Sequence, residues 1–340
     1  MINELLKRYY GLSVMSIEKS AVGAGSDTYF AECKNGKYVV KFPSESDINN
    51  PSAEPELCGF LLDRGINVSS FLKNTDGGFI TSDDSGRIFH VQEFAEGTLY
   101  DWNTAPSWLL KASAETLGRI HSALKNYTDL PTGIGADFFK FMTPENALYS
   151  YENTLETARK NGDKEIEKDL LYRIELMKRF PDYSFDIDRL TCQGTHGDYF
   201  ISQLICGDED INAVIDWTTA CVHPVVWEIV RSYVYAAPEC ADGEINISEL
   251  AEYFRSYCKF SKLNDYDFQN ALRLFYYQIA VCDYYNQYYT SDASNREIYL
   301  QQAFFSTRLL KWFENNIDTA EKKIGSQQQT VACQAMTTML

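Results

Sequence analysis

The sequence predicts an α+β protein, with a mainly β-stranded segment first and a longer, mainly helical segment after it. A chain of 340 residues is longer than one ordinary hydrophobic core supports, so we expect about two domains. Apolar residues make up 45% of the chain and aromatic residues 14%, which indicates a packed globular protein and not a disordered one. Short apolar runs with turn signals fill residues 16–94, whereas apolar residues recur at helical spacing beyond residue 107.

The β-stranded segment follows a short helix that we expect over residues 1–10. Two apolar runs, 29–33 and 37–42, flank the dipeptide Asn35-Gly36, which is typical of a two-residue hairpin turn. We therefore expect a β-hairpin here, with Lys41 near the end of its second strand.

A glycine-rich loop, Gly-Ala-Gly-Ser-Asp-Thr, precedes this hairpin at residues 23–28. Glycine lets the main chain approach a ligand closely, so backbone N–H groups at Gly23, Gly25 and Ser26 can bind phosphate oxygens. The loop is not a Walker A loop, because no Gly-Lys-Ser/Thr follows it. A plain hairpin turn is the alternative interpretation.

A helix over about residues 52–64 follows the hairpin and carries two acids in its first turn, Glu54 and Glu56. The proline between them is tolerated at the start of a helix. Either carboxylate could reach Lys41, and acids at this position also interact favourably with the helix dipole without any catalytic purpose. Both remain candidates for an ion pair with Lys41.

Residues 67–94 predict further strands, and the run 88–94 ends at a change from strand to loop around Glu93 and Ala95. We expect the first domain to span residues 1–97 and the second to span residues 98–324. The second domain carries helical patterns, and the segment 325–340 has no amphipathic period and is expected to be a mobile tail. The expected helices cover about residues 107–124, 145–179, 225–236, 247–260, 266–289 and 296–315.

Two acids frame the most informative stretch, residues 194–232. Asp198 ends a His-Gly-Asp sequence, and Asp216 ends a short apolar strand beyond a turn at residues 207–210. A hairpin between them would bring the two carboxylates close together. Phosphoryl transfer needs one such group to orient and deprotonate an attacking hydroxyl and another to hold the Mg²⁺ that bridges the nucleotide phosphates.

This stretch resembles the aminoglycoside phosphotransferase and choline kinase family, which is distantly related to protein kinases. The matching residues are His196-Gly197-Asp198 and Ile215-Asp216-Trp217, followed by Glu228 where the family usually has Asp. Gln203 stands where the family mostly has a metal-binding Asn. Gln offers the same amide oxygen on a stem one methylene longer, so it can still serve a cation that prefers oxygen ligands.

The resemblance implies a bilobal protein-kinase-like fold, with a small antiparallel β-sheet lobe that contains one helix and a larger, mainly helical lobe. ATP would lie in the cleft between the lobes together with Mg²⁺. Asp198 would act on the acceptor hydroxyl while His196 supports the catalytic loop. Asp216 would bind Mg²⁺ with help from Gln203.

The resemblance also assigns the nucleotide contacts. Lys41 would neutralise phosphate oxygens, and Glu54 or Glu56 would hold it extended. The backbone of Gly23, Gly25 and Ser26 would cover the phosphates. Main-chain groups of Glu93 and Ala95 would bind the adenine.

The charge of the chain bears on its partners. A net charge of −17 disfavours nucleic acid and anionic membranes and favours cationic partners, although acidity also serves solubility alone. An aminoglycoside-like or other amino-bearing acceptor would suit it, while choline, homoserine, a sugar or a macrolide are alternatives. The run Cys282–Tyr289 could form an acidic and aromatic wall for such an acceptor, or simply pack its tyrosines against neighbouring helices.

Other features narrow the class of protein. Nine cysteines without a C-x-x-C pair fit neither a zinc site nor a disulfide framework, and we expect reduced thiols. No apolar run has the length of a membrane span and the first residues lack a signal peptide pattern, so we expect a cytoplasmic protein. Gln203 leaves one alternative function open, a kinase-like protein that binds nucleotide or a partner without catalysis.

Overall fold

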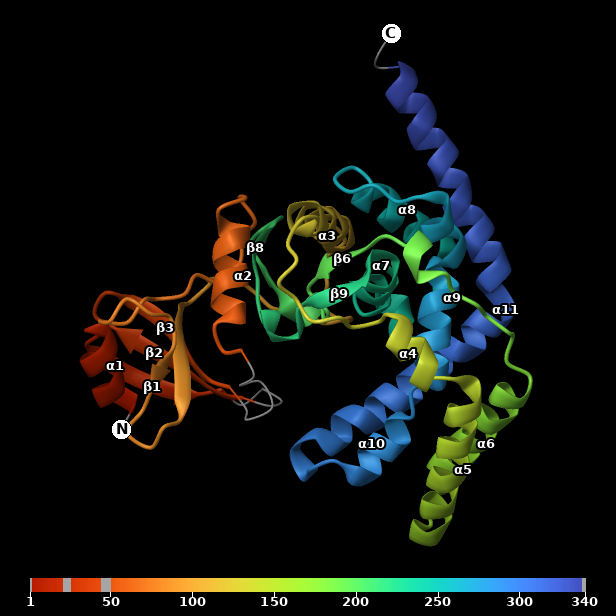
Figure 1. Cartoon of the computed structure of the whole chain (residues 1–340), viewed down its shortest axis with the longest axis horizontal. Helices are drawn as coiled ribbons and strands as arrows, with labels where there is room; N and C mark the ends of the chain where they lie inside the picture. The colour runs from red at the N-terminus through yellow and green to blue at the C-terminus, as the bar shows by residue number, and fades with distance from the viewer. Residues whose placement is uncertain (1, 21–25, 44–49, 338–340) are drawn as a thin grey trace. The chain divides into compact units, whose positions relative to one another are not determined.

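The computed structural model describes residues 2–20, 26–43 and 50–337 (Figure 1). The chain divides into two compact units, of which the first comprises Met1–Leu99 with Ser202–Ala220 and the second comprises Tyr100–Ile201 with Cys221–Leu340. The segment that carries Gln203 and Asp216 therefore packs with the N-terminal residues, although it lies far along the chain. Asp198 belongs to the second unit.

A five-stranded antiparallel sheet forms the first unit, in the spatial order β1-β2-β3-β5-β4. Helix α1 packs Leu5 and Leu6 into a core with Phe42, Phe89 and other buried residues of the sheet. The elements of this part are α1 (Ile2–Tyr10), β1 (Val14–Lys19), β2 (Asp27–Cys33), β3 (Gly36–Phe42), α2 (Ala53–Leu62), β4 (Thr81–Ser82) and β5 (Ile88–Glu93).

The hairpin between β2 and β3 turns one residue earlier than the sequence predicts. Cys33 pairs with Gly36, so Lys34 and Asn35 form the turn and Gly36 is the first residue of β3. Gly36 has a φ of 145°, a conformation that L side chains rarely adopt. The glycine is needed at the start of the strand and not within the turn.

A second hairpin, β7 (Leu204–Cys206) with β8 (Ile211–Val214), completes the first unit. Thr98 and Cys206 exchange two backbone hydrogen bonds of 2.8 and 2.9 Å. A Cβ atom on Gly97 would lie 2.5 Å from the carbonyl oxygen of Cys206, so only glycine permits this approach. These contacts fix the strand that leads to Asp216 against the N-terminal part of the chain.

Helices dominate the second unit, together with the ribbon of β6 (Cys192–Thr195) and β9 (Cys221–Pro224). Helix α7 (Val225–Val234) is its most buried element, with nine of its ten residues buried. The other helices are α3 (Leu109–Leu124), α4 (Ala136–Phe141), α5 (Pro144–Asn161), α6 (Lys164–Lys178), α8 (Ile247–Tyr257), α9 (Asp265–Val281), α10 (Tyr284–Thr290) and α11 (Ala293–Thr337).

Three helical boundaries differ from those that the sequence predicts. The charged stretch 145–179 is two helices that lie side by side in Figure 1, because Gly162 ends α5 in the left-handed conformation with φ of 77°. The expected helix 266–289 is broken at Asp283, whose side chain accepts the N–H of Asn286 and so begins α10. Helix α11 runs on to Thr337 and includes most of the expected tail.

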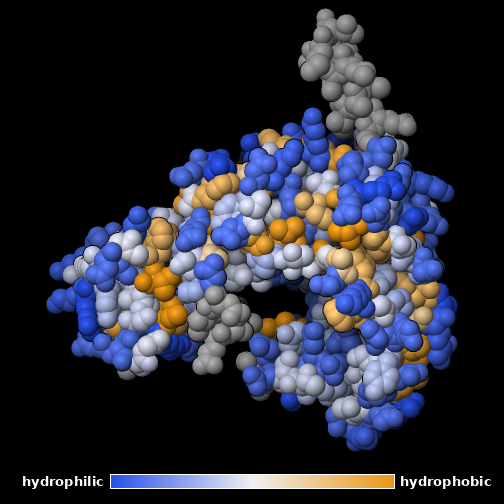
Figure 2. Space-filling model, in the orientation of Figure 1, coloured by the Kyte–Doolittle hydropathy of each residue, from blue (hydrophilic) through white to orange (hydrophobic). Residues whose placement is uncertain are grey.

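The described residues include no helix that is both long and apolar enough to cross a membrane. The face drawn in Figure 2 is mostly hydrophilic, with hydrophobic residues in small scattered patches. The eight cysteines described are unpaired thiols, as the sequence predicts for reduced cysteines.

Candidate functional site

Lys41 and Asp216 form an ion pair in the first unit. The Nζ atom of Lys41 lies 2.8 Å from Oδ1 of Asp216, and the lysine side chain is 12% exposed while the aspartate side chain is 43% exposed. Strand β3 places Lys41 between its register partners Thr28 on β2 and His90 on β5. The pair therefore joins the sheet to the end of the β7–β8 hairpin and leaves part of the carboxylate open to solvent.

The backbone of Asp216 is strained. Among the described residues it is the only one besides glycine with a positive φ, at 64°, a conformation that costs roughly 1–3 kcal/mol at a residue with a side chain. Trp217 holds the chain in place, since its indole Nε1 donates to the carbonyl of Val214 at 3.0 Å and its side chain is 1% exposed. In this conformation the carboxylate of Asp216 contacts Lys41.

Of the two acids in helix α2, Glu54 lies beside this pair and Glu56 is exposed. The buried carboxylate of Glu54 accepts the backbone N–H of Trp217 at 3.1 Å, the residue after Asp216. Both Glu54 and Lys41 are close to the buried thiol of Cys58, whose pKa is raised by burial and by Glu54 and lowered by Lys41. The structure thus brings Glu54, Lys41 and Asp216 together.

His90 is a neutral neighbour of the ion pair that the sequence did not single out. Burial and, to a smaller extent, the charge of Lys41 lower the pKa of His90 to about 3, against the opposing effect of Asp216. Its Nε2 lies 3.3 Å from Nε2 of Gln92. A buried neutral imidazole beside Lys41 adds no charge that competes with the lysine.

Gln203 lies across the β7–β8 hairpin from Ile215, the residue before Asp216, since its carbonyl accepts the N–H of Ile215 at 3.0 Å. The carboxylate of Asp216 and the amide oxygen of Gln203 are the hard oxygen donors that Mg²⁺ prefers, and protein sites for this ion commonly supply only one or two such ligands beside phosphate. The described residues contain no group of three or more His, Cys, Asp or Glu side chains arranged for a metal. The donor set fits an ion that is shared with a nucleotide.

The remaining expected nucleotide contacts are distributed around the sheet. Ser26 precedes β2 and its hydroxyl lies 3.5 Å from that of Thr28, while Gly23 and Gly25 lie outside the described residues. The N–H of Glu93 donates to Ser70 at 2.9 Å. Among the described residues, the N–H of Ala95 donates to no backbone carbonyl.

In the second unit, Glu228 on helix α7 holds the His-Gly-Asp loop. Its carboxylate oxygens accept the backbone N–H groups of His196 at 3.2 Å and Gly197 at 2.6 Å. The buried ring of His196 accepts the N–H of Asp198 at its Nδ1, 3.3 Å away. In this structure His196 supports the loop, and Gly197 takes the left-handed conformation that the turn requires, with φ of 81°.

Glu228 is fully buried and is matched by a second partner, His121 of helix α3. The two side chains are 2.8 Å apart, and the other ring nitrogen of His121 lies 2.9 Å from the hydroxyl of Tyr257. Burial raises the pKa of Glu228, but the hydrogen bond and charge of His121, with smaller effects of His196 and His223, outweigh burial, so the carboxyl pKa is lowered overall. Glu228 stays ionised and keeps the loop anchored.

Arg231 also binds the loop, one turn further along α7. Its guanidinium forms a salt bridge with the carboxylate of Asp198, and the two side chains are 15% and 34% exposed. Arg231 is not among the residues that the sequence motifs predict, although its position three residues after Glu228 places both side chains on one face of a helix. That spacing is the signal that could have identified it.

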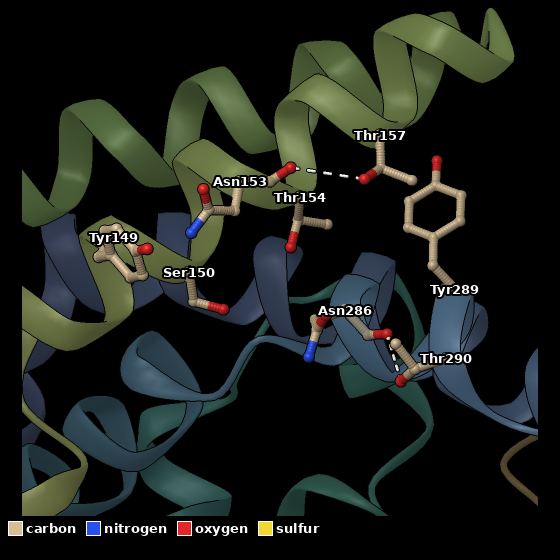
Figure 3. Close-up of a pocket in the computed structure, with 8 residues that line it drawn as sticks. All are labelled: Tyr149, Ser150, Asn153, Thr154, Thr157, Asn286, Tyr289 and Thr290. Carbon is tan, nitrogen blue, oxygen red and sulfur yellow. Dashed lines mark hydrogen bonds between the residues drawn. The ribbon is translucent and has the colours of Figure 1, made fainter.

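A polar pocket of about 370 Å³ lies between helices α5 and α10 of the second unit (Figure 3). Every residue that lines it carries a hydroxyl or a carboxamide, and none is charged. These residues are Tyr149, Ser150, Asn153, Thr154, Thr157, Asn286, Tyr289 and Thr290. Tyr289 and Asn286 come from the run that the sequence analysis considered as a wall for the acceptor.

Comparisons with known proteins agree with this arrangement. Residues 16–268 match the model of the phosphotransferase enzyme family, APH. A comparison with curated proteins finds no match. An amicoumacin kinase in complex with AMP-PNP, Ca²⁺ and Ami has a similar fold, with a TM-score of 0.63, 14% identity and coverage of 90% of this chain and 92% of that one.

Two further solved structures are similar. A spectinomycin phosphotransferase in complex with ADP and its antibiotic has a TM-score of 0.58 at 15% identity, covering 95% of this chain and 98% of that one. A microcompartment-associated aminopropanol kinase has a TM-score of 0.59 at 13% identity, covering 94% and 98%. The fold is protein-kinase-like, as the sequence predicts. Because the family model covers most of its length, the chain belongs to the phosphotransferase enzyme family, as a kinase that acts on a hydroxyl group.

Proposed function

We propose that this protein is an ATP-dependent O-phosphotransferase that moves the γ-phosphate to a hydroxyl of a small, amine-bearing molecule. The observation that carries the proposal is the contact of 2.8 Å between Lys41 and the strained Asp216. A lysine on a sheet and an acid after a hairpin are the two groups that this chemistry uses to neutralise phosphate and to hold its metal. The AMP-PNP and ADP in the similar structures support a nucleotide as donor.

In the first unit, each residue near the pair takes one role. Asp216 and Gln203 would hold Mg²⁺, which when bound offsets the charge of the phosphate oxygens. Lys41 donates to those oxygens as a second positive charge, and Glu54 keeps its ammonium group in place. Glu93 and Ala95 present main-chain groups to the base, and Ser26 with Gly23 and Gly25 covers the phosphates.

Asp198 is the general base of the proposed reaction. It accepts a hydrogen bond from the acceptor hydroxyl and takes its proton as the new O–P bond forms and the bond to the leaving nucleotide oxygen breaks. His196 takes no proton in this proposal, because its Nδ1 is used by the N–H of Asp198. A positioned base typically contributes about 10² to 10⁴ in rate.

Asp198→Asn tests this role, because it keeps the shape of the side chain and removes its basicity. We expect phosphoryl transfer to fall at least about 100-fold while ATP affinity changes little. Asp186→Asn is the matched control, because Asp186 is an exposed acid of the same unit that lies outside the His-Gly-Asp loop. Full turnover by Asp198→Asn would remove Asp198 from the mechanism.

The pocket between α5 and α10 supports an acceptor with N–H groups. Ser150 and Thr154 donate their hydroxyl protons to Asp283 at 2.7 and 2.8 Å, and Tyr289 donates to Asp163 at 2.6 Å. A hydroxyl has one proton and two lone pairs. These three oxygens can therefore only accept further hydrogen bonds, so a ligand that contacts them must be the donor.

The same polarity separates the acceptor classes that the sequence left open. Amino sugars and homoserine carry ammonium groups with several N–H donors, and the carboxylates behind the hydroxyls add a favourable negative potential. The quaternary nitrogen of choline has no N–H, and a macrolide presents mostly carbon to a pocket whose lining side chains all carry a hydroxyl or a carboxamide. We therefore propose an amine-bearing acceptor with several hydroxyls.

Release of ADP with glucosamine, glucose, homoserine and choline as acceptors compares these classes. We expect the amine-bearing polyol to give the highest kcat/KM. Tyr289→Phe should raise its KM about tenfold, whereas Tyr172→Phe, which removes an equivalent tyrosine bond to Glu314 of 2.5 Å, should not. Equal turnover of glucose and glucosamine would reject the amine requirement and leave the phosphotransferase proposal intact.

Gln203 favours a second candidate, a kinase-like protein that binds nucleotide without catalysis. Magnesium requires near-ideal octahedral geometry, and the longer side chain displaces the amide oxygen relative to asparagine. Gln203→Asn separates the two functions. If the natural protein is inactive and Gln203→Asn gains turnover, the natural protein binds nucleotide without catalysis. If the natural protein is already active, it is a phosphotransferase.

A further inference from the structure

Arg231 is the single residue of helix α7 that is not buried in the core, and its guanidinium faces the catalytic loop. It binds the carboxylate of Asp198 and also donates to the carbonyl oxygen of Tyr199 at 3.4 Å. The same group therefore contacts both the side chain of Asp198 and the backbone that follows it.

Three aromatic rings hold the guanidinium in this position. Its central carbon lies 4.7 Å from the ring centroid of Tyr235, 5.1 Å from that of Phe200 and 5.8 Å from that of Trp227. Each ring face attracts the cation, and the planar guanidinium loses little freedom when it is packed in this way. Arg231 is therefore a fixed charge, unlike a mobile surface arginine.

Helix α7 binds the loop through two residues. Glu228 accepts the N–H groups of His196 and Gly197. Arg231 binds the carboxylate of Asp198. The two charged residues stand three positions apart, so they lie on one helix face. Glu228 fixes the backbone of the loop. Arg231 fixes the side chain that the backbone carries.

We propose that Arg231 is a positioning residue that aims the carboxylate of Asp198 and keeps it ionised for phosphoryl transfer. This inference rests on the proposed function of Asp198. A carboxylate bound to arginine is a weaker base than a free one. In a loose transition state the base mainly orients the hydroxyl and takes its proton late, so orientation contributes more than basicity.

The proposal implies a direction for the pH dependence. Three groups face Asp198: the guanidinium of Arg231, the ring of His196 and the phenol of Tyr235. The charge of Asp198 contributes to raising the pKa of Tyr235. Removal of the guanidinium takes away the positive charge that favours the ionised carboxylate. Asp198 should then bind a proton at a higher pH than it does in the natural protein.

The test compares Arg231→Met and Arg231→Lys with Arg273→Met, which breaks a 2.8 Å salt bridge to Glu321 elsewhere in the same unit. The carboxyl carbon of Asp198 is followed by ¹³C NMR during a pH titration, with Asp198→Asn used to assign the signal. We expect the midpoint to rise by at least about one pH unit in Arg231→Met, a tenfold change in proton affinity. It should rise less in Arg231→Lys and remain unchanged in Arg273→Met.

The second measurement is turnover with the best of the four acceptors named above. If none of them is phosphorylated, the hydrolysis of ATP by water is measured instead. Arg231→Met should lower kcat about 100-fold with little change in the KM for ATP. In a plot of kcat against pH, the fall in activity on the acidic side should begin at a higher pH in this variant. Added guanidinium ion should restore part of the activity of Arg231→Ala but not of Asp198→Asn. An unchanged titration midpoint or a kcat within twofold of the natural protein would overturn the role of Arg231. If the natural protein shows no turnover while the titration midpoint of Asp198 still shifts in Arg231→Met, the proposed function is rejected and the effect of Arg231 on Asp198 stands.

Discussion

The ammonium nitrogen of Lys41 lies 2.8 Å from Oδ1 of Asp216, although 175 positions of the sequence separate the two residues. The contact exists because Ser202–Ala220 belongs to the same compact unit as the N-terminal residues. Thr218 donates its hydroxyl to the same oxygen at 2.9 Å. One carboxylate oxygen of Asp216 thus has two donors in the protein.

Replacement of Lys41 should remove most of the activity. Lys41→Met keeps the length of the side chain but takes away its charge, so kcat/KM for ATP should fall about 100-fold or more. Lys37→Met on the same strand is the control, because its ion pair with Glu96 is exposed. Steady-state release of ADP measures both, and equal losses would show that Lys41 has no special role.

The two glutamates of helix α2 should differ in their effects. Glu54 is buried and bonded to Trp217, whereas Glu56 is exposed. Glu54→Gln should lower kcat/KM for ATP roughly tenfold, as is usual for residues that orient a functional group, and Glu56→Gln should change it less than about twofold. The reverse order would assign the role to Glu56.

Glu228 should be essential for stability. Glu228→Gln leaves His121 and the loop N–H groups without their charged partner, and breaking a buried pair of this kind costs about 3–5 kcal/mol. The pKa of Glu228 is lower in the folded protein than in the unfolded chain, where it is about 4.5. The stability that Glu228 contributes is therefore present above pH 4.5 and decreases as the pH falls below that value. Thermal unfolding at pH 7 and pH 4 measures this, and a variant as stable as the natural protein at pH 7 would contradict it.

His90 should make the protein sensitive to mild acid. Its pKa is lowered to about 3 from a usual value of 6.5, so only the unfolded chain binds its proton between these values. The free energy of unfolding should therefore decrease as the pH falls from 6.5, by up to about 1.4 kcal/mol per pH unit. His90→Gln should reduce this slope in chemical unfolding at several pH values. An identical slope in both proteins would mean that His90 is protonated in the folded state.

The sequence predicted much of the fold and site because its strongest signals are local. The apolar run before Asp216 and the turn before it predicted the β7–β8 hairpin, and the helical stripe from Leu110 to Leu124 predicted α3. The turn at Asn35-Gly36 was misplaced by one residue, since Cys33 pairs with Gly36. Dipeptide preference does not specify register.

Other features depend on tertiary contacts that no local pattern reveals. The break between α9 and α10 follows from one cap by Asp283, in a run of residues that could equally continue as a helix. The position of the Arg231 guanidinium depends on the carboxylate of Asp198 and on three aromatic rings from separate positions. The proposal of Glu54 over Glu56 rests on the burial of each side chain in the folded unit.

Thermal unfolding with ATP, in the presence and absence of Mg²⁺, tests the central proposal most directly. With ATP at about 100 times its dissociation constant, binding stabilises the folded state by about 2.7 kcal/mol. We predict that the natural protein shows this stabilisation fully only with Mg²⁺, and that Asp216→Asn loses the metal-dependent part. No stabilisation by ATP, or an equal metal-dependent stabilisation in Asp216→Asn, would contradict a nucleotide site built on Lys41 and Asp216.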